Sequence, residues 1–216
     1  REMEREADAG SIAELVRGGY DPRAASAVWA QLRAEMDATA RERRHRSDKD
    51  RNGGIFASHP GTGDRMATLA QLAESAAAGR PDLALRAAEY RQALAGWWPQ
   101  LIADQIALQD FGGTEYLLQT LAGDAADGWT GDLLYARGEL YRSRGKADDY
   151  AAAAGFFRQA IATGTAPAES WRGLGLALLK SGQAEDGRAM LRDYLARRPA
   201  AEDAAILAAM AQETAG

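Results

Sequence analysis

The sequence contains no cysteine, and only 7% of its 216 residues are aromatic. A chain without cysteine forms neither disulfides nor thiolate metal sites. No apolar run approaches the roughly 18 residues that are needed to span a bilayer, so we expect no transmembrane segment in this chain. The formal net charge of −5 gives no general reason to expect a nucleic-acid partner, because proteins that bind nucleic acids usually present a basic domain or face.

The residues that are abundant favour helices. Alanine, leucine and arginine are frequent, whereas β-branched residues are scarce, and we therefore expect an all-α fold. With 216 residues, the chain is long enough for one large domain or two modest ones. It starts with Arg1 and helix-like sequence, without the charged and apolar regions of a signal peptide. We expect a fragment or a processed product whose targeting segment lay upstream.

Glycine and proline mark the expected helices of the N-terminal third. The first helix should cover residues 2–18 and end at Gly18 and Gly19, since glycine suits the left-handed conformation that closes many helices. Asp21 and Pro22 then favour a new helix, as its N-cap and its first helical residue. The expected buried face of this second helix has helical spacing and consists of Ala25, Val28, Trp29, Leu32 and Met36.

The stretch that follows, RERRHRSDKDRNGG at 41–54, has almost no apolar residues. We interpret it as a mobile, solvated loop. A basic nucleic-acid patch is the other interpretation, but Asp48 and Asp50 interrupt it and no aromatic residue is interleaved to stack on bases. A helix should start near Thr62 or Asp64, whose side chains can cap it. Further helices are expected at 82–95, 99–109 and 114–122.

The C-terminal third repeats itself. WRGLGLALLKSGQ at 171–183 and LLYARGELYRSRG at 133–145 align with an offset of 37 residues, which matches Gly138 with Gly175. The pattern resembles that of tetratricopeptide repeats, in which small residues let paired helices approach. Such an array usually offers a groove to a peptide or protein partner. The other interpretation is that the repeats only stabilise the domain before them.

The first helix carries a pair of acidic residues on one face. Glu4 and Asp8 are four residues apart, beside the small Ala7, so a helix places both on the same side. Two carboxylates on one face suit a metal site. They also suit an ordinary solvated helix, because acidic residues are expected in a first turn. Spacing leaves both interpretations open.

Three motifs, taken in order, are more informative than the spacing of the acidic residues. EREAD at 4–8, GYDPRAA at 19–25 and SHPGTGDRMATL at 58–69 resemble the zinc metallopeptidases of the HtpX and CAAX prenyl protease type. The likeness is strongest to the periplasmic, BepA-like branch of that family, which carries C-terminal tetratricopeptide repeats. In that family an H-E-x-x-H helix supplies two zinc-binding imidazoles and the general base, and a later E-x-x-A-D helix supplies the third ligand.

The resemblance implies a role for four residues. Glu4 is the implied zinc ligand, and Asp8 is the implied outer carboxylate that orients a ligating histidine. His59 would bind the metal reversibly or stabilise an oxyanion, although a histidine before a proline also suits a plain turn. Arg65 would hold a carboxylate or a substrate carbonyl. Glu6 falls on a different helix face, where we expect it to be solvated.

One departure from the family is large. The chain has only two histidines, His45 and His59, and no H-E-x-x-H. We therefore expect this chain alone to bind zinc weakly or not at all and to be inactive. The expected division is the C-terminal part of a metallopeptidase domain at 1–80, connecting helices at 81–130 and repeats at 131–216.

Two hypotheses follow. In the first, the chain is the C-terminal portion of a zinc-dependent endopeptidase that acts on protein or peptide substrates. The resemblance implies a periplasmic location, a part in envelope protein quality control, and repeats that bind substrate or an envelope protein partner. The alternative is a non-catalytic tetratricopeptide adaptor whose protease half has degenerated. An H-E-x-x-H motif upstream of Arg1 in the reading frame would decide for the enzyme.

Overall fold

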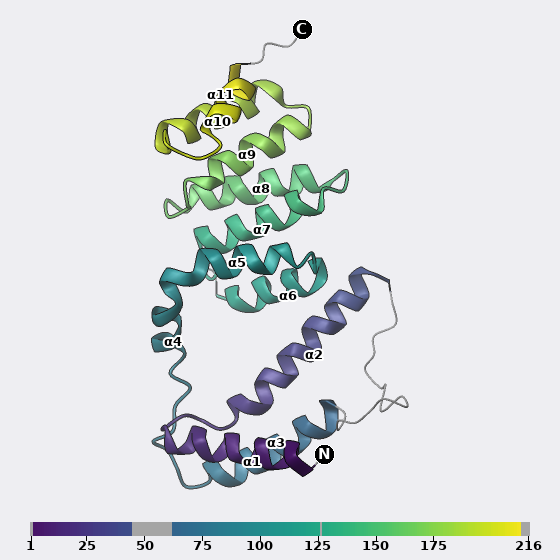
Figure 1. Ribbon diagram of the computed structural model, residues 1–216, viewed down its shortest axis with the longest axis vertical. Helices are drawn as coiled ribbons and strands as arrows, with labels where there is room; N and C mark the ends of the chain where they lie inside the picture. Colours follow the sequence, from purple (N-terminus) through teal and green to yellow (C-terminus); the bar gives the residue numbers. More distant parts are fainter. Residues whose placement is uncertain (1, 45–61, 126, 213–216) are drawn as a thin grey trace. The chain divides into compact units, whose positions relative to one another are not determined.

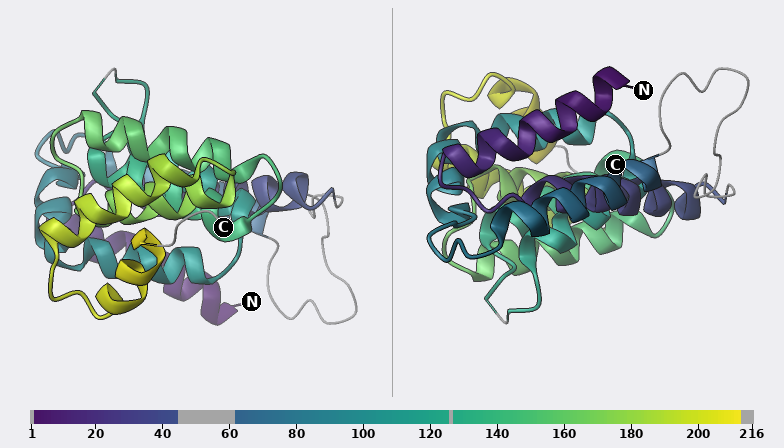
Figure 2. Two further views of the ribbon diagram at one scale, coloured as in Figure 1. Left: turned by 90° about the horizontal axis from the view of Figure 1, so that it is seen from above. Right: turned by 90° about the horizontal axis from the view of Figure 1, so that it is seen from below.

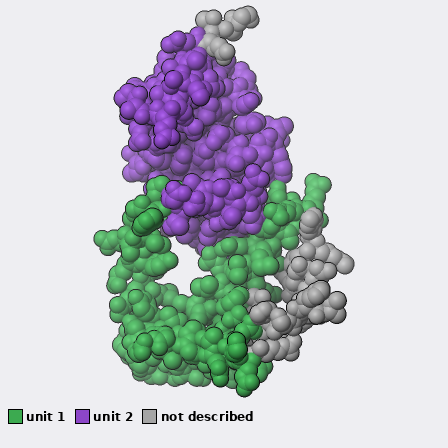
Figure 3. Space-filling view, in the orientation of Figure 1, with its two compact units in different colours: residues 1–99 green, residues 100–216 purple. Residues whose placement is uncertain are grey.

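The described part of a computed structural model comprises residues 2–44, 62–125 and 127–212 (Figure 1). Every named element in these ranges is a helix, which confirms the expected all-α fold. None of these helices is long and apolar enough to cross a membrane. The chain divides into two compact units, Arg1–Pro99 and Gln100–Gly216, coloured green and purple in Figure 3. The division lies within the segment that was expected to hold connecting helices.

The first unit is built mainly from three helices. Its elements are α1 (Glu2–Arg17), α2 (Ala24–Glu42), α3 (Thr62–Ala77), α4 (Ala87–Leu94) and the 3-10 turn η1 (Ala95–Trp97). The first helix ends as predicted, because Gly19 has a φ of +74°, in the left-handed region. Asp21 Oδ1 accepts a hydrogen bond of 3.0 Å from the Arg23 amide, so it closes the turn from which α2 starts.

The small core of the first unit joins α1 to α3. Ile12 of α1 is buried with Leu69 and Ala73 of α3, and Trp29 of α2 packs against them. One turn earlier on both helices, Arg65 contacts Asp8, so α1 and α3 run in the same direction. The loops after the two helices also pair, since the Asp21 amide donates a 3.0 Å hydrogen bond to the Ala84 oxygen.

The predicted buried face of α2 is wrong for three of its five residues. Val28, Leu32 and Met36 are exposed, to 66%, 43% and 57%. Only Ala25 and Trp29 reach the core. Helical periodicity shows that a face is apolar, but it does not show how much of that face has a neighbour. In the described part of the unit, α3 covers one edge of the face and leaves the rest open.

From α6 to α11, the helices of the second unit stack in chain order (Figures 1 and 2). Its helices are α5 (Trp98–Ala107), α6 (Phe111–Ala122), α7 (Gly131–Arg144), α8 (Asp149–Ala162), α9 (Glu169–Lys180), α10 (Ala184–Arg197) and α11 (Ala204–Gln212). Phe157 of α8 is fully buried against Leu174 and Leu178 of α9. Leu191 and Tyr194 of α10 form a second buried cluster with Leu207 and Ala211 of α11. Each cluster is thus built by consecutive helices.

Glycines bring these helices close together. A Cβ added to Gly138 would lie 2.6 Å from a ring carbon of Phe157, and one added to Gly173 would meet the same ring. At Gly175, an added Cβ would lie 2.7 Å from Leu191 Cδ2 on α10. These distances are shorter than any normal carbon contact. The prediction that Gly175 marks a helix contact is therefore confirmed.

Helix α6 packs on α7, and it precedes the predicted start of the repeats at residue 131. The ring of Phe111 meets the edge of Tyr141, with 5.0 Å between centroids. The guanidinium carbon of Arg144 lies 3.4 Å from the Phe111 ring centroid. Arg137 of α7 also pairs with Glu115 of α6. The packed unit therefore begins upstream of the repeat pattern in the sequence.

Candidate functional site

The acidic face of α1 is directed into the first unit at Asp8. Asp8 is buried, with 6% of its surface exposed, Glu4 is half-buried, and Glu6 is exposed. Glu4 and Asp8 lie one helical turn apart and share a face, whereas Glu6 lies on another face. The expectation that Glu6 is solvated is confirmed.

Arg65 of α3 holds the carboxylate of Asp8 with two hydrogen bonds. Its Nε donates to Oδ2 over 3.0 Å, and its Nη2 donates to Oδ1 over 2.5 Å. Both side chains are largely withdrawn from solvent, with 21% of Arg65 and 8% of Asp8 exposed. A bidentate pair of this kind is among the strongest hydrogen-bonding arrangements in proteins. One of the roles expected for Arg65 was to hold a carboxylate, and in the structure the carboxylate is that of Asp8.

The third member of the site comes from α2. The guanidinium carbon of Arg65 lies 4.4 Å from the centre of the Trp29 ring, within the range of a cation–π contact. All three long helices of the unit therefore meet in the Asp8–Arg65–Trp29 cluster. Sequence reasoning placed Trp29 only in a buried face. No spacing rule links it to an arginine 36 positions further along the chain, so the sequence held no local signal for this contact.

The electrostatics of the cluster favour the charged form of Arg65. The hydrogen bonds to Asp8 raise the pKa of Arg65 above its ordinary value, although burial opposes this shift. The negative charges of Asp8 and Glu4 raise the pKa of Arg65 further. The charge of Glu4, one turn before Asp8, thus also favours the charged guanidinium.

The described residues do not by themselves fit a catalytic zinc ion. Such an ion takes three protein ligands. The described ranges contain no group of three histidine, cysteine, aspartate or glutamate residues that could hold a metal. Glu4 is the single ligand that the resemblance assigns there, while His45 and His59 lie outside the described residues. No catalytic step through zinc follows from this part of the chain.

Comparison with models of protein families gives a match in the N-terminal part of the chain. Residues 1–73 match the model of Peptidase family M48, and this segment contains Glu4, Asp8, Trp29 and Arg65. No curated protein and no solved structure matches the chain. The family match covers about a third of the 216 residues and supports a metallopeptidase-type function for the segment that holds the cluster.

Proposed function

We propose that the chain is the C-terminal portion of a zinc-dependent endopeptidase that acts on proteins. The observation that carries this proposal is the match of residues 1–73 to Peptidase family M48. Three of the residues singled out in the sequence, Glu4, Asp8 and Arg65, gather within that segment around one cluster. Under the proposal, the missing imidazole ligands and general base come from an H-E-x-x-H segment of a longer chain.

The geometry of Asp8 is compatible with the role that the proposal gives it. An ionised carboxylate offers about four lone-pair sites on its two oxygens. Arg65 occupies one site on each oxygen, so Asp8 retains capacity to accept a further hydrogen bond from an imidazole. Arg65 would then fix the carboxylate while Asp8 orients the histidine. His59 keeps its proposed role at the metal or at an oxyanion.

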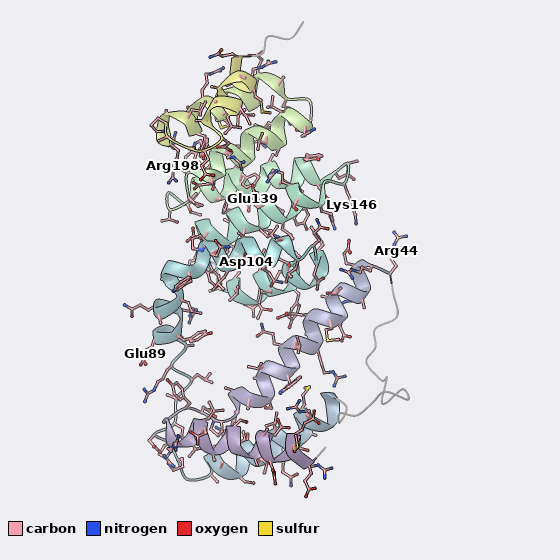
Figure 4. The ribbon with its side chains drawn as sticks, viewed as in Figure 1. Arg44, Glu89, Asp104, Glu139, Lys146 and Arg198 are labelled. Carbon is pink, nitrogen blue, oxygen red and sulfur yellow. The ribbon has the colours of Figure 1, made fainter. Side chains whose placement is uncertain are left out.

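We assign protein binding to the second unit within the same proposal. The tight contacts at Gly138 and Gly175 agree with the tetratricopeptide-like frame. Helix α7 also carries charges near its neighbour α9: Glu139, labelled in Figure 4, accepts a 3.0 Å hydrogen bond from Arg142. Burial and the charges of Glu139 and Glu169 raise the pKa of Tyr135. Stacked helical repeats usually present an extended surface to a protein or peptide ligand. The periplasmic location and the part in envelope quality control rest on the family resemblance.

A non-catalytic adaptor is the second candidate. The Asp8–Arg65 pair fits this candidate, because a contact that ties α1 to α3 suits a scaffold without any metal. The 216-residue sequence also has no H-E-x-x-H. In an adaptor the pair would hold helices together and take no part in chemistry.

The experiment that separates the candidates uses the full-length product of the reading frame that contains this chain. We expect it to copurify with zinc and to hydrolyse an unfolded protein such as casein, and we expect a chelator to stop hydrolysis. The 216-residue chain alone should bind zinc weakly and cleave nothing. A full-length product that neither binds zinc nor cleaves casein would favour the adaptor.

A further inference from the structure

We propose that Trp29 is a positioning residue of the candidate site. Its ring holds the guanidinium of Arg65 in the orientation in which Arg65 grips both oxygens of Asp8. Through this grip Trp29 fixes the acidic face of α1, which carries Glu4 one turn before Asp8. The consequence for catalysis rests on the proposed function, whereas the effect of Trp29 on Arg65 does not.

The geometry of the arginine shows why a support is needed. Arg65 makes its two hydrogen bonds, 3.0 Å and 2.5 Å, through Nε and Nη2, so one edge of the planar guanidinium must face the carboxylate. The side chain of arginine is long and loses much rotamer freedom when it is held in one geometry. The Trp29 ring, 4.4 Å from the guanidinium carbon, restricts that freedom by covering one face of the group.

The Trp29 ring is itself held in place. It packs against the buried cluster of Ile12, Leu69 and Ala73, which joins α1 to α3. A side chain anchored in the core thus supports a flexible side chain at the site. None of the acidic residues singled out at the site lies on helix α2. This helix contributes the Trp29 ring. The neighbouring Val28 is 66% exposed and provides a control on the same helix.

The first test uses the 216-residue chain and nuclear magnetic resonance of the Arg65 Nε–H group. In the native chain this proton should exchange slowly with water and carry a ring-current shift from Trp29. Trp29→Leu keeps an apolar side chain but removes the ring, and exchange should become about 3- to 30-fold faster. Trp29→Phe retains a weaker ring and should give an intermediate rate. Val28→Ala should leave the rate unchanged.

The ordering of these rates decides the matter. The proposal would be overturned if the Arg65 Nε–H exchanged at the same rate with tryptophan, phenylalanine and leucine at position 29, in chains with equal melting temperatures. If Trp29→Leu does not fold, Trp29→Phe decides alone. Faster Arg65 exchange at an unchanged melting temperature supports the positioning role, and unchanged exchange refutes it. A residue that only filled the core would lower the melting temperature without a specific effect on Arg65.

The second test uses the full-length protein and separates kcat from KM for casein. Trp29→Leu should lower kcat and leave KM almost unchanged. The loss of kcat should be smaller than the about 10- to 100-fold loss expected when Asp8 itself is removed. Trp29→Phe should restore much of the loss. An unchanged kcat in Trp29→Leu would overturn the catalytic consequence. If the unsubstituted protein shows no hydrolysis, the proposed function fails, and the exchange rates still decide the role of Trp29.

Discussion

Replacing Gly175 with alanine should give the second unit a lower free energy of unfolding than the same replacement at Gly155. Both glycines lie inside helices, α9 and α8, so alanine improves local helix propensity equally, by about 0.5–1 kcal/mol. At Gly155 an added Cβ meets nothing within 4 Å. At Gly175 it would lie 2.7 Å from Leu191 Cδ2 and 2.9 Å from the backbone oxygen of Gly187. The Leu191 side chain can rotate, but the Gly187 oxygen moves only with α10.

The expected magnitude follows from this difference. Overpacking a close helix contact costs about 1–3 kcal/mol. Gly155→Ala should therefore stabilise the unit slightly, and Gly175→Ala should fall about 1–3 kcal/mol below it in free energy of unfolding. Gly175→Leu should fall further. Urea unfolding followed by circular dichroism measures all three variants. Equal unfolding midpoints for the two alanine variants would refute the close approach of α9 and α10.

Two further predictions concern ion pairs. Arg144 and the Lys146 amide donate hydrogen bonds to buried Asp149, and these bonds lower the pKa of its carboxyl. The Arg144–Asp149 pair therefore stabilises the fold at pH values above the pKa of the unfolded carboxyl. This stabilisation is lost as pH falls through the lower pKa of the folded state. Asp149→Asn should cost about 1–3 kcal/mol at pH 7 and much less near pH 2, and urea midpoints that differ equally at both pH values would contradict this. In the full-length protein, Asp8→Ala should weaken zinc affinity or activity by about 10- to 100-fold, which a chelator competition assay measures, and an unchanged affinity would remove Asp8 from the site.

The local signals in the sequence predicted helices well. Gly19 ends α1 with a positive φ, as expected. A left-handed residue at a helix end is a local requirement of the backbone, and glycine meets it most easily. Asp21 also closes the turn before α2. The glycine at 175 was predictable because the repeat pattern places small residues where helices meet. Each of these signals depends on residues close in sequence or on a repeated pattern.

The same sequence signals failed where burial or a contact depends on a residue that is distant in the sequence. Val28, Leu32 and Met36 have helical spacing but are exposed, because α3 covers only one edge of α2. The hydrogen bonds from Arg65 to Asp8 could not be located from sequence, since the two residues are 57 positions apart in the chain. The role of His59 stays a prediction, because it lies outside the described residues.

The most direct test of the metallopeptidase account compares two glutamates of α1 in the full-length protein. Glu4 is half-buried and acts on Arg65, whereas Glu6 is exposed on another face of the same helix. Zinc content and casein hydrolysis should both be lost in Glu4→Gln, because Glu4 is the proposed zinc ligand, and nearly unchanged in Glu6→Gln. The second variant is a matched control, since both substitutions remove one charge from the same helix. Equal behaviour of the two variants would show that EREAD is only a charged helix start and would contradict the account.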